Sequence, residues 1–157
     1  MLPIHTILYS TDFSSLSYHA FEVASAMAAD YRARLVILHV HEPPLPMGEL
    51  VPSEPAGYHE TLLENLRELK PSGQVATDYR VEVGTVAEGI VRVANEIDCD
   101  LIVLGTQGKT GLRRAILGSV AESVLRKSPC LVLAVKPGAV TQRLTDSARG
   151  GRQGSGG

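Results

Sequence analysis

The stretch from Gly105 to Ser119 reads GTQGKTGLRRAILGS, in which the glycines at 105, 108 and 118 and the final serine follow the spacing G-x2-G-x9-G-S. A short apolar run, 101–104, precedes this stretch, and an amphipathic segment, 120–127, follows it. The glycines therefore lie where a strand passes into a helix. At such a junction, backbone N–H groups can approach an anion without a Cβ in the way, and the helix N-terminus adds partial positive charge. The stretch predicts a binding site for phosphate groups.

Two commoner phosphate motifs do not fit this stretch. A Walker A loop ending at Gly108-Lys109-Thr110 would need a glycine at position 103, which is Val103. The dinucleotide fingerprint G-x-G-x-x-G follows the first strand of a sheet, whereas the glycines here follow the fourth expected strand. A glycine-rich loop that only turns the chain remains the alternative to a nucleotide site.

Length and composition favour one α/β domain. The chain has 157 residues, of which 44% are hydrophobic and only 4% aromatic, with no tryptophan. A core of Val, Ile, Leu and Ala is typical of a parallel sheet covered by helices. We expect a domain over residues 1–138 and a flexible tail rich in Gly, Arg and Ser over 139–157.

The net charge and the N-terminal residues argue against nucleic-acid binding and membrane insertion. The formal net charge of −2 gives no basic surface of the kind that nucleic-acid binding requires. The segment MLPIH runs directly into a strand pattern, without a charged leader or a long apolar run. We therefore expect a cytoplasmic protein that inserts into no membrane.

Strand and helix patterns alternate along the chain. Four continuous apolar runs predict buried strands near 4–10, 35–40, 100–104 and 131–135, and an alternating segment at 75–83 predicts an edge strand. Helices are expected to begin near Ser14, Tyr58, Thr85 and Val120, with Thr85 and Glu88 forming a capping box. The proline-rich segment 41–57 predicts a long loop. This alternation indicates a doubly wound sheet with right-handed crossovers.

Three segments resemble the universal stress protein family. They are Tyr9 to Ser14, the strand end Leu38-His39-Val40, and the G-x2-G-x9-G-S pattern followed by VAESVL and SPC. The similarity spans about 1–136, and its glycine pattern is that of the ATP-binding branch of the family. The resemblance implies a single-domain, five-stranded parallel sheet of order 3-2-1-4-5 with helices on both faces. Its ligand would lie over strands one and four, which is also the topological switch point of such a sheet.

The resemblance also implies roles for particular residues. Asp12 would contact the nucleoside or its metal-phosphate group, the Val40 backbone would read the adenine edge, and Gly105 would lie under the ribose. Phosphates would be held at the glycine loop and the start of the last helix. The full implied set is Ser10, Thr11, Asp12, Val40, Gly105, Gly108, Lys109, Gly118, Ser119 and Val120. Asp12 has the alternative role of a turn or N-cap aspartate.

The expected ligand is ATP, with ADP or AMP as alternatives and Mg²⁺ as a companion of ATP. We expect a stress or regulatory protein whose nucleotide tunes oligomerisation or partner binding. The alternatives are a slow ATP hydrolase and an interaction module that binds no nucleotide. No residue stands out as a base for attack on the γ-phosphate, so we assign no catalytic residue. His39 and His41 lack a third ligand, so we expect no protein-held metal.

Two further expectations concern the last strand. The run from Leu131 to Val135 has no charge, proline or bulge to protect a free edge, so we expect it to pair with a second copy in a homodimer. Cys99 and Cys130 precede neighbouring strands and can lie within disulfide range, but we expect both to be free thiols that pack as small hydrophobes.

Overall fold

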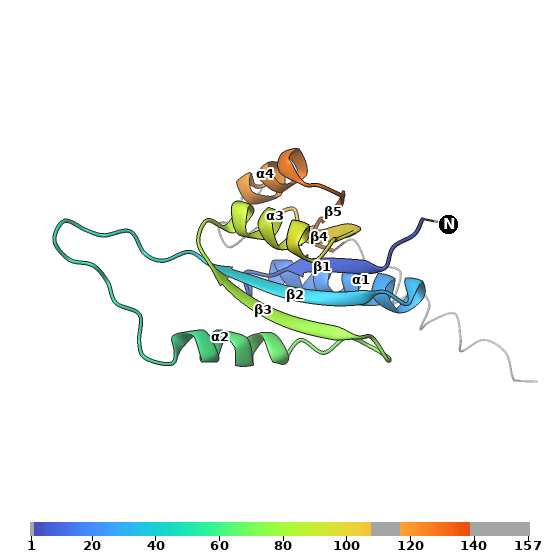
Figure 1. The fold of residues 1–157 in the computed structure, drawn as a ribbon, viewed down its shortest axis with the longest axis horizontal. Coiled ribbons are helices and arrows are strands. Elements are labelled where there is room, and N and C mark those ends of the chain that lie inside the picture. The colour runs from blue at the N-terminus through green and yellow to red at the C-terminus, as the bar shows by residue number, and fades with distance from the viewer. Residues whose placement is uncertain (1, 108–116, 139–157) are drawn as a thin grey trace, which may run out of the picture.

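The computed structural model describes residues 2–107 and 117–138. Its strands are β1 (Thr6–Ser10), β2 (Arg34–His41), β3 (Thr77–Val83), β4 (Leu101–Gly105) and β5 (Leu131–Val135). Its helices are α1 (Ser15–Tyr31), α2 (Tyr58–Arg67), α3 (Val86–Glu96) and α4 (Ser119–Lys127). The strands form one parallel sheet of order β3-β2-β1-β4-β5, which confirms the predicted fold (Figure 1).

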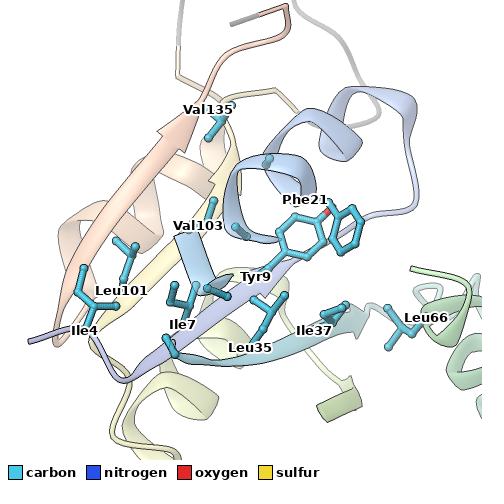
Figure 2. Packing of buried hydrophobic residues seen from close by; sticks show 14 residues of the cluster. Ile4, Ile7, Tyr9, Phe21, Leu35, Ile37, Leu66, Leu101, Val103 and Val135 are labelled. Carbon is cyan, nitrogen blue, oxygen red and sulfur yellow. The ribbon is translucent and has the colours of Figure 1, made fainter. Parts of the chain in front are cut away.

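Helices cover both faces of the sheet. Residues of α1 and α2 pack on one face in a hydrophobic cluster that includes Tyr9, Phe21, Ile37 and Leu66 (Figure 2). Residues of α3 and α4 pack on the other face, against Leu8 and the neighbouring β2 and β4 residues that point that way. Because both faces are buried, the central strands read as continuous apolar runs rather than as alternating ones. This two-sided core holds the strand ends rigidly in place.

The helix starts differ in how they are capped. Ser14 precedes α1, and its side chain accepts a hydrogen bond from the Ser17 N–H, as the sequence predicts. The capping box predicted at Thr85 and Glu88 is wrong. Thr85 does occupy the N-cap of α3, but its side chain makes no capping hydrogen bond. The buried face of α3, which includes Ile90 and Val93, packs in the hydrophobic cluster.

The two edges of the sheet differ in character. On β3, which the sequence correctly predicts as an edge, Arg80 donates to Glu82 at 2.7 Å and to Glu96 of α3 at 2.8 Å. These ion pairs place charge along that edge and join it to α3. On β5, Leu131 is 53% exposed, while Val135 is buried in the core. Within the part of the chain that the structure describes, β5 pairs only with β4.

The predicted loop follows β2. Residues 42–57 contain no helix or strand beyond an isolated bridge between Met47 and Leu50, and they extend well away from the sheet (Figure 1). His41 contacts Glu54 across the base of this loop. None of the helices in residues 2–107 and 117–138 has the length and apolar character needed to cross a membrane.

Candidate functional site

A cavity of about 380 Å³ opens at the carboxyl ends of β1 and β4. This is the point where the order of the sheet reverses, because β1 leads outward to β2 and β4 leads outward to β5. The wall consists of the β1 and β4 ends, the end of β2, one face of α3 and the first turn of α4. Its lining residues are Ser10, Thr11, Asp12, Ser17, Val40, Glu42, Val86, Ile90, Leu104, Gly105, Thr106, Gln107, Gly118, Ser119, Val120 and Ala121.

The end of β1 is fixed through Thr11. Its N–H donates to the Leu38 carbonyl at 2.9 Å, and its own carbonyl lies 2.9 Å from Nδ1 of the buried His39 ring. The Thr11 hydroxyl lies 3.0 Å from the Ser17 hydroxyl and accepts from the Phe13 N–H at 3.0 Å. With main chain and side chain both held, this residue presents the next one, Asp12, to the cavity in a defined orientation.

Asp12 both lines the cavity and shapes the turn into α1. Its Oδ1 accepts hydrogen bonds from the Ser14 N–H at 2.9 Å and from the Ser14 hydroxyl at 2.5 Å. Ser14 in turn caps α1. The alternative role given to Asp12 by the sequence, that of a turn aspartate, is therefore real, and it coexists with the position of Asp12 in the cavity wall.

The buried Tyr9 connects the end of β1 to the first turn of α1. The Tyr9 hydroxyl donates to the Ser17 carbonyl at 2.8 Å, and its ring packs against Phe21. Burial raises the pKa of Tyr9 above its ordinary value, outweighing the lowering by hydrogen bonds to Thr11 and Ser17. The phenol therefore stays neutral and keeps donating to the first turn of α1 throughout the physiological range.

The backbone of Val40 faces the cavity. The Leu38 carbonyl points toward β1, where it accepts from Thr11, and the His41 carbonyl points toward β3, where it accepts from the Gly84 N–H at 2.9 Å. Backbone groups of a strand alternate in direction, so the N–H and C=O of Val40 point to the same side as those of Leu38. Beyond Thr11, β1 no longer covers that side. A donor and an acceptor are thus available to a planar ligand.

Close approach of α3 to β2 depends on Gly89. A Cβ on this residue would lie 2.8 Å and 2.9 Å from the two γ-carbons of Val40. Because valine has little rotamer freedom, any side chain at this position would push the helix away from the strand or displace Val40. Gly89 therefore brings the helix face carrying Val86 and Ile90 close enough to form a wall of the cavity.

The opposite wall is the junction between β4 and α4. The Thr106 N–H donates to the Val135 carbonyl at 3.0 Å, and the Thr106 carbonyl accepts from the Gly118 N–H at 2.7 Å. Gly118 is the N-cap of α4, which starts at Ser119. The first N–H groups of a helix lack intrahelical acceptors and carry partial positive charge, so this end of the cavity suits an anion.

The structure gives a reason for glycine at 118 that differs from the one expected. The sequence explains glycine at this junction by the close approach of backbone N–H groups to a bound phosphate. In the structure, a Cβ on Gly118 would lie 3.0 Å from the Thr106 carbonyl oxygen. That spacing is tight against backbone, so a larger residue would push the two ends of the glycine loop apart even before any ligand binds.

The structure brings most of the predicted site together. Gly108 and Lys109 lie outside the described residues. The other predicted positions all line the cavity: Ser10, Thr11, Asp12, Val40, Gly105, Gly118, Ser119 and Val120. The lining residues that sequence reasoning did not name as site residues are Ser17, Glu42, Val86, Ile90, Leu104, Thr106, Gln107 and Ala121, of which the last four are close neighbours in sequence of predicted positions. Ser17 could have been found from its place one turn into the first helix, but nothing local distinguishes Glu42, Val86 or Ile90.

Metal-ligating side chains do not cluster in the part of the chain that the structure describes. Residues 2–107 and 117–138 contain no group of three or more His, Cys, Asp or Glu side chains that could hold a metal ion. The His39 and His41 rings lie 6.5 Å apart. The His39 ring contacts Phe13 at a centroid distance of 4.5 Å, which makes His39 a packing residue at the β1 end.

These features define an open, doubly wound α/β protein with a ligand-sized cavity at the switch point of its sheet. Residues 3–136 match the model of the Universal stress protein family, and the chain belongs to that family. Among its relatives is universal stress protein MJ0531 of Methanocaldococcus jannaschii, which is 36% identical over 141 residues covering 83% of this chain and 81% of the relative. A universal stress protein of Thermus aquaticus is 34% identical over 134 residues, covering 83% of this chain and 98% of the relative.

Solved structures share the fold. A universal stress protein crystallised in complex with cAMP has a TM-score of 0.66 and 28% identity, covering 87% of this chain and 99% of that chain. Protein MJ0577 has a TM-score of 0.64 and 27% identity, covering 86% of this chain and 97% of that chain. The predicted family resemblance is therefore confirmed.

Proposed function

We propose that this protein binds an adenine nucleotide, with ATP as the expected ligand, in the cavity over β1 and β4. The single observation that carries the proposal is the arrangement of that cavity. The backbone of Val40 lies at one wall and the N-terminus of α4 at the other, with Asp12 and Gly105 between them. The cAMP held by a structural relative is the same class of ligand.

The two walls match the two ends of the ligand. Adenine presents a ring-nitrogen acceptor beside an amino donor, which complements the N–H and C=O of one extended residue such as Val40. Guanine presents a donor and an acceptor in the reverse places, so the same backbone would disfavour it. The phosphates would meet the Ser119 hydroxyl and the free N–H groups of α4.

The cavity also contains negative charge. Asp12 and Glu42 both line it, and two carboxylates repel a bare triphosphate. Mg²⁺ is commonly bound by one or two carboxylates together with substrate phosphates, so the residues present fit a Mg²⁺ ion that arrives with ATP. We therefore expect ATP to bind more tightly in the presence of Mg²⁺, whereas AMP should respond far less.

We further propose that nucleotide occupancy regulates assembly through β5. The Val135 carbonyl points toward β4, where it accepts from the Thr106 N–H. By alternation, the backbone groups of Ala134 and Val132 point to the outer edge, where the described chain provides no partner strand. A second copy could add there in the antiparallel sense and form a continuous sheet across a twofold axis.

The experiment that tests nucleotide binding has two parts. Purified protein is denatured, and the released small molecules are separated by chromatography. A second, folded portion that has been dialysed free of nucleotide is titrated calorimetrically with ATP, GTP and inorganic tripolyphosphate. We expect adenine nucleotide in the released fraction and micromolar-range ATP affinity, with weaker binding of the other two. Equal binding of ATP and tripolyphosphate would show that no base is recognised, and heats indistinguishable from dilution for all three would refute the proposal.

A further inference from the structure

The only two cysteines of the chain precede the amino ends of β4 and β5, at the end of the sheet opposite the cavity. Leu101 of β4 is paired in parallel register with Leu131 of β5. Cys130 directly precedes Leu131, and Cys99 lies two residues before Leu101. Both cysteines lie just before these strands, and their side chains are in hydrogen-bond contact, which places the two thiols beside one another.

The side chains of this pair share one environment. Both cysteines belong to the hydrophobic cluster on the α3 and α4 face, with Cys99 only 8% exposed. The Cys99 sulfur lies 3.1 Å from the Leu101 carbonyl oxygen, and the Cys130 sulfur lies 3.6 Å from the Ser128 hydroxyl. Burial, together with the adjacent Cys130 thiol, raises the pKa of Cys99 to about 12. Both are free thiols in this structure.

The difference in burial gives the two thiols different accessibility. Cys130 is half-buried and follows the turn at Ser128, whereas Cys99 is buried beneath α3 and α4. A small oxidant from solvent therefore meets Cys130 first. Cys99 is shielded from solvent, so it can react only with a group that is already beside it.

We propose that Cys99 and Cys130 are a redox-active pair that a peroxide converts into a reversible intramolecular disulfide. The Cys130 sulfur attacks one oxygen of hydrogen peroxide, giving a sulfenic acid and one water. The Cys99 sulfur then attacks the sulfenic sulfur, and the hydroxyl leaves with the Cys99 proton as a second water. Both sulfurs together lose two electrons, which reduce the peroxide to two waters.

The bridge would enclose the segment that carries the glycine motif. The segment between the two cysteines contains β4, the glycine stretch and α4. A cross-link at its two ends restricts the unfolded chain and thus stabilises the folded state of this segment. The bridge would form at the amino ends of β4 and β5, whereas the cavity opens at the carboxyl ends of the strands. We therefore expect the bridge to leave the lining residues in place. Oxidation should therefore raise the melting temperature while changing ATP affinity less than twofold, and this inference stands whether or not ATP is the ligand.

The test uses the full-length reduced protein and hydrogen peroxide. Thiol counting under denaturing conditions should fall from two per chain to none, and the intact mass should fall by two hydrogens. Peptide mapping without reductant should find Cys99 linked to Cys130 within one chain, and dithiothreitol should restore both thiols. Two thiols remaining after peroxide, a bridge between chains, or added oxygen atoms in place of lost hydrogens would each overturn the proposal.

Single variants separate the two roles. Cys99→Ser should accumulate a Cys130 sulfenic acid that dimedone traps, because the second thiol is missing. Cys130→Ser should keep the Cys99 thiol unreacted at the same peroxide dose, since no accessible partner remains. Cys130→Ala provides the same readout if the serine variant folds poorly. Peroxide-dependent dimedone labelling of Cys99 in either Cys130 variant would contradict the assigned order.

Discussion

Substitutions of Asp12 can separate an effect on ligand binding from an effect on folding. Its Oδ1 accepts two hydrogen bonds from Ser14, at 2.9 Å and 2.5 Å, while the carboxylate also lines the cavity. Asp12→Asn keeps an oxygen that can accept from Ser14 but removes the charge. Asp12→Ala removes both the oxygen and the charge. The pair of variants therefore distinguishes the turn from the ligand contact.

The expected sizes follow from these contacts. Losing two partly buried hydrogen bonds costs about 1–3 kcal/mol of stability, and a chain of this size loses roughly 2–4 °C of melting temperature per kcal/mol. Asp12→Ala should thus melt about 3–10 °C lower, whereas Asp12→Asn should change by roughly 2 °C or less. A charged hydrogen bond to the ligand contributes about 1.5–3 kcal/mol, so both variants should bind ATP roughly 10- to 100-fold more weakly.

The assay combines calorimetric ATP titration with thermal unfolding followed by circular dichroism. Ser14→Ala is the matched control, because it removes the cap of α1 and leaves the carboxylate in place. It should lower the melting temperature by a few degrees, at about 1 kcal/mol for a lost cap, and leave ATP affinity within about threefold. Wild-type affinity in Asp12→Asn would refute the reasoning, since the carboxylate would then serve only the turn.

Three other predictions rest on single contacts. Gly89→Ala should lose about 1–2 kcal/mol of unfolding free energy, because overpacking against Val40 outweighs the gain in helix propensity. The ATP affinity of this variant should fall several-fold. An unchanged denaturant midpoint and an unchanged affinity would show that α3 can move away from β2 without cost. Ala134→Pro removes an outward N–H from β5 and should yield monomers in sedimentation velocity with a cooperative melt, whereas wild-type protein that already sediments as a monomer would exclude the edge interface. Tyr9→Phe should lose about 1 kcal/mol at neutral pH with the hydrogen bond to Ser17. Because the folded pKa of Tyr9 is raised, wild-type stability should fall as pH rises beyond about 10, and a variant with the same alkaline decline would contradict this.

Burial along β5 decides which substitution can test the edge. A lysine at Val132 or Val135 is the substitution that the apolar run of β5 suggests for disrupting the edge. The structure places Val135 in the core, so a lysine there would test folding rather than association. A backbone probe at Ala134 avoids this problem, because its N–H points outward and its removal leaves the β4 ladder intact.

The strands themselves and the junction between β4 and α4 could be predicted because their signals are local, whereas the strand order 3-2-1-4-5 came from the family resemblance. Continuous apolar runs mark strands buried on both faces, and the glycine spacing marks the junction between β4 and α4. Gly89 and Glu42 carry no such signal. The need for glycine at 89 arises only when α3 lies against Val40, and Glu42 reaches the cavity only because β2 ends beside it. These are properties of tertiary packing.

The capping of α3 is a further limit of local patterns. Threonine followed three residues later by glutamate fits a capping box, and the helix does begin after Thr85. The capping hydrogen bond is nevertheless missing, while Ile90 and Val93 on the buried face of α3 pack in the hydrophobic cluster. The motif therefore predicts the start of the helix correctly, although the capping interaction on which the prediction rested is absent.

A crystal structure of the protein grown with Mg²⁺ and ATP tests the central claim most directly. We expect the adenine edge within hydrogen-bond distance of the Val40 N–H and C=O, with the phosphates at the Ser119 hydroxyl and the first N–H groups of α4. We also expect the Asp12 carboxylate to contact the ribose or the metal-phosphate group. An empty cavity at saturating ATP, or nucleotide bound elsewhere on the molecule, would contradict the account.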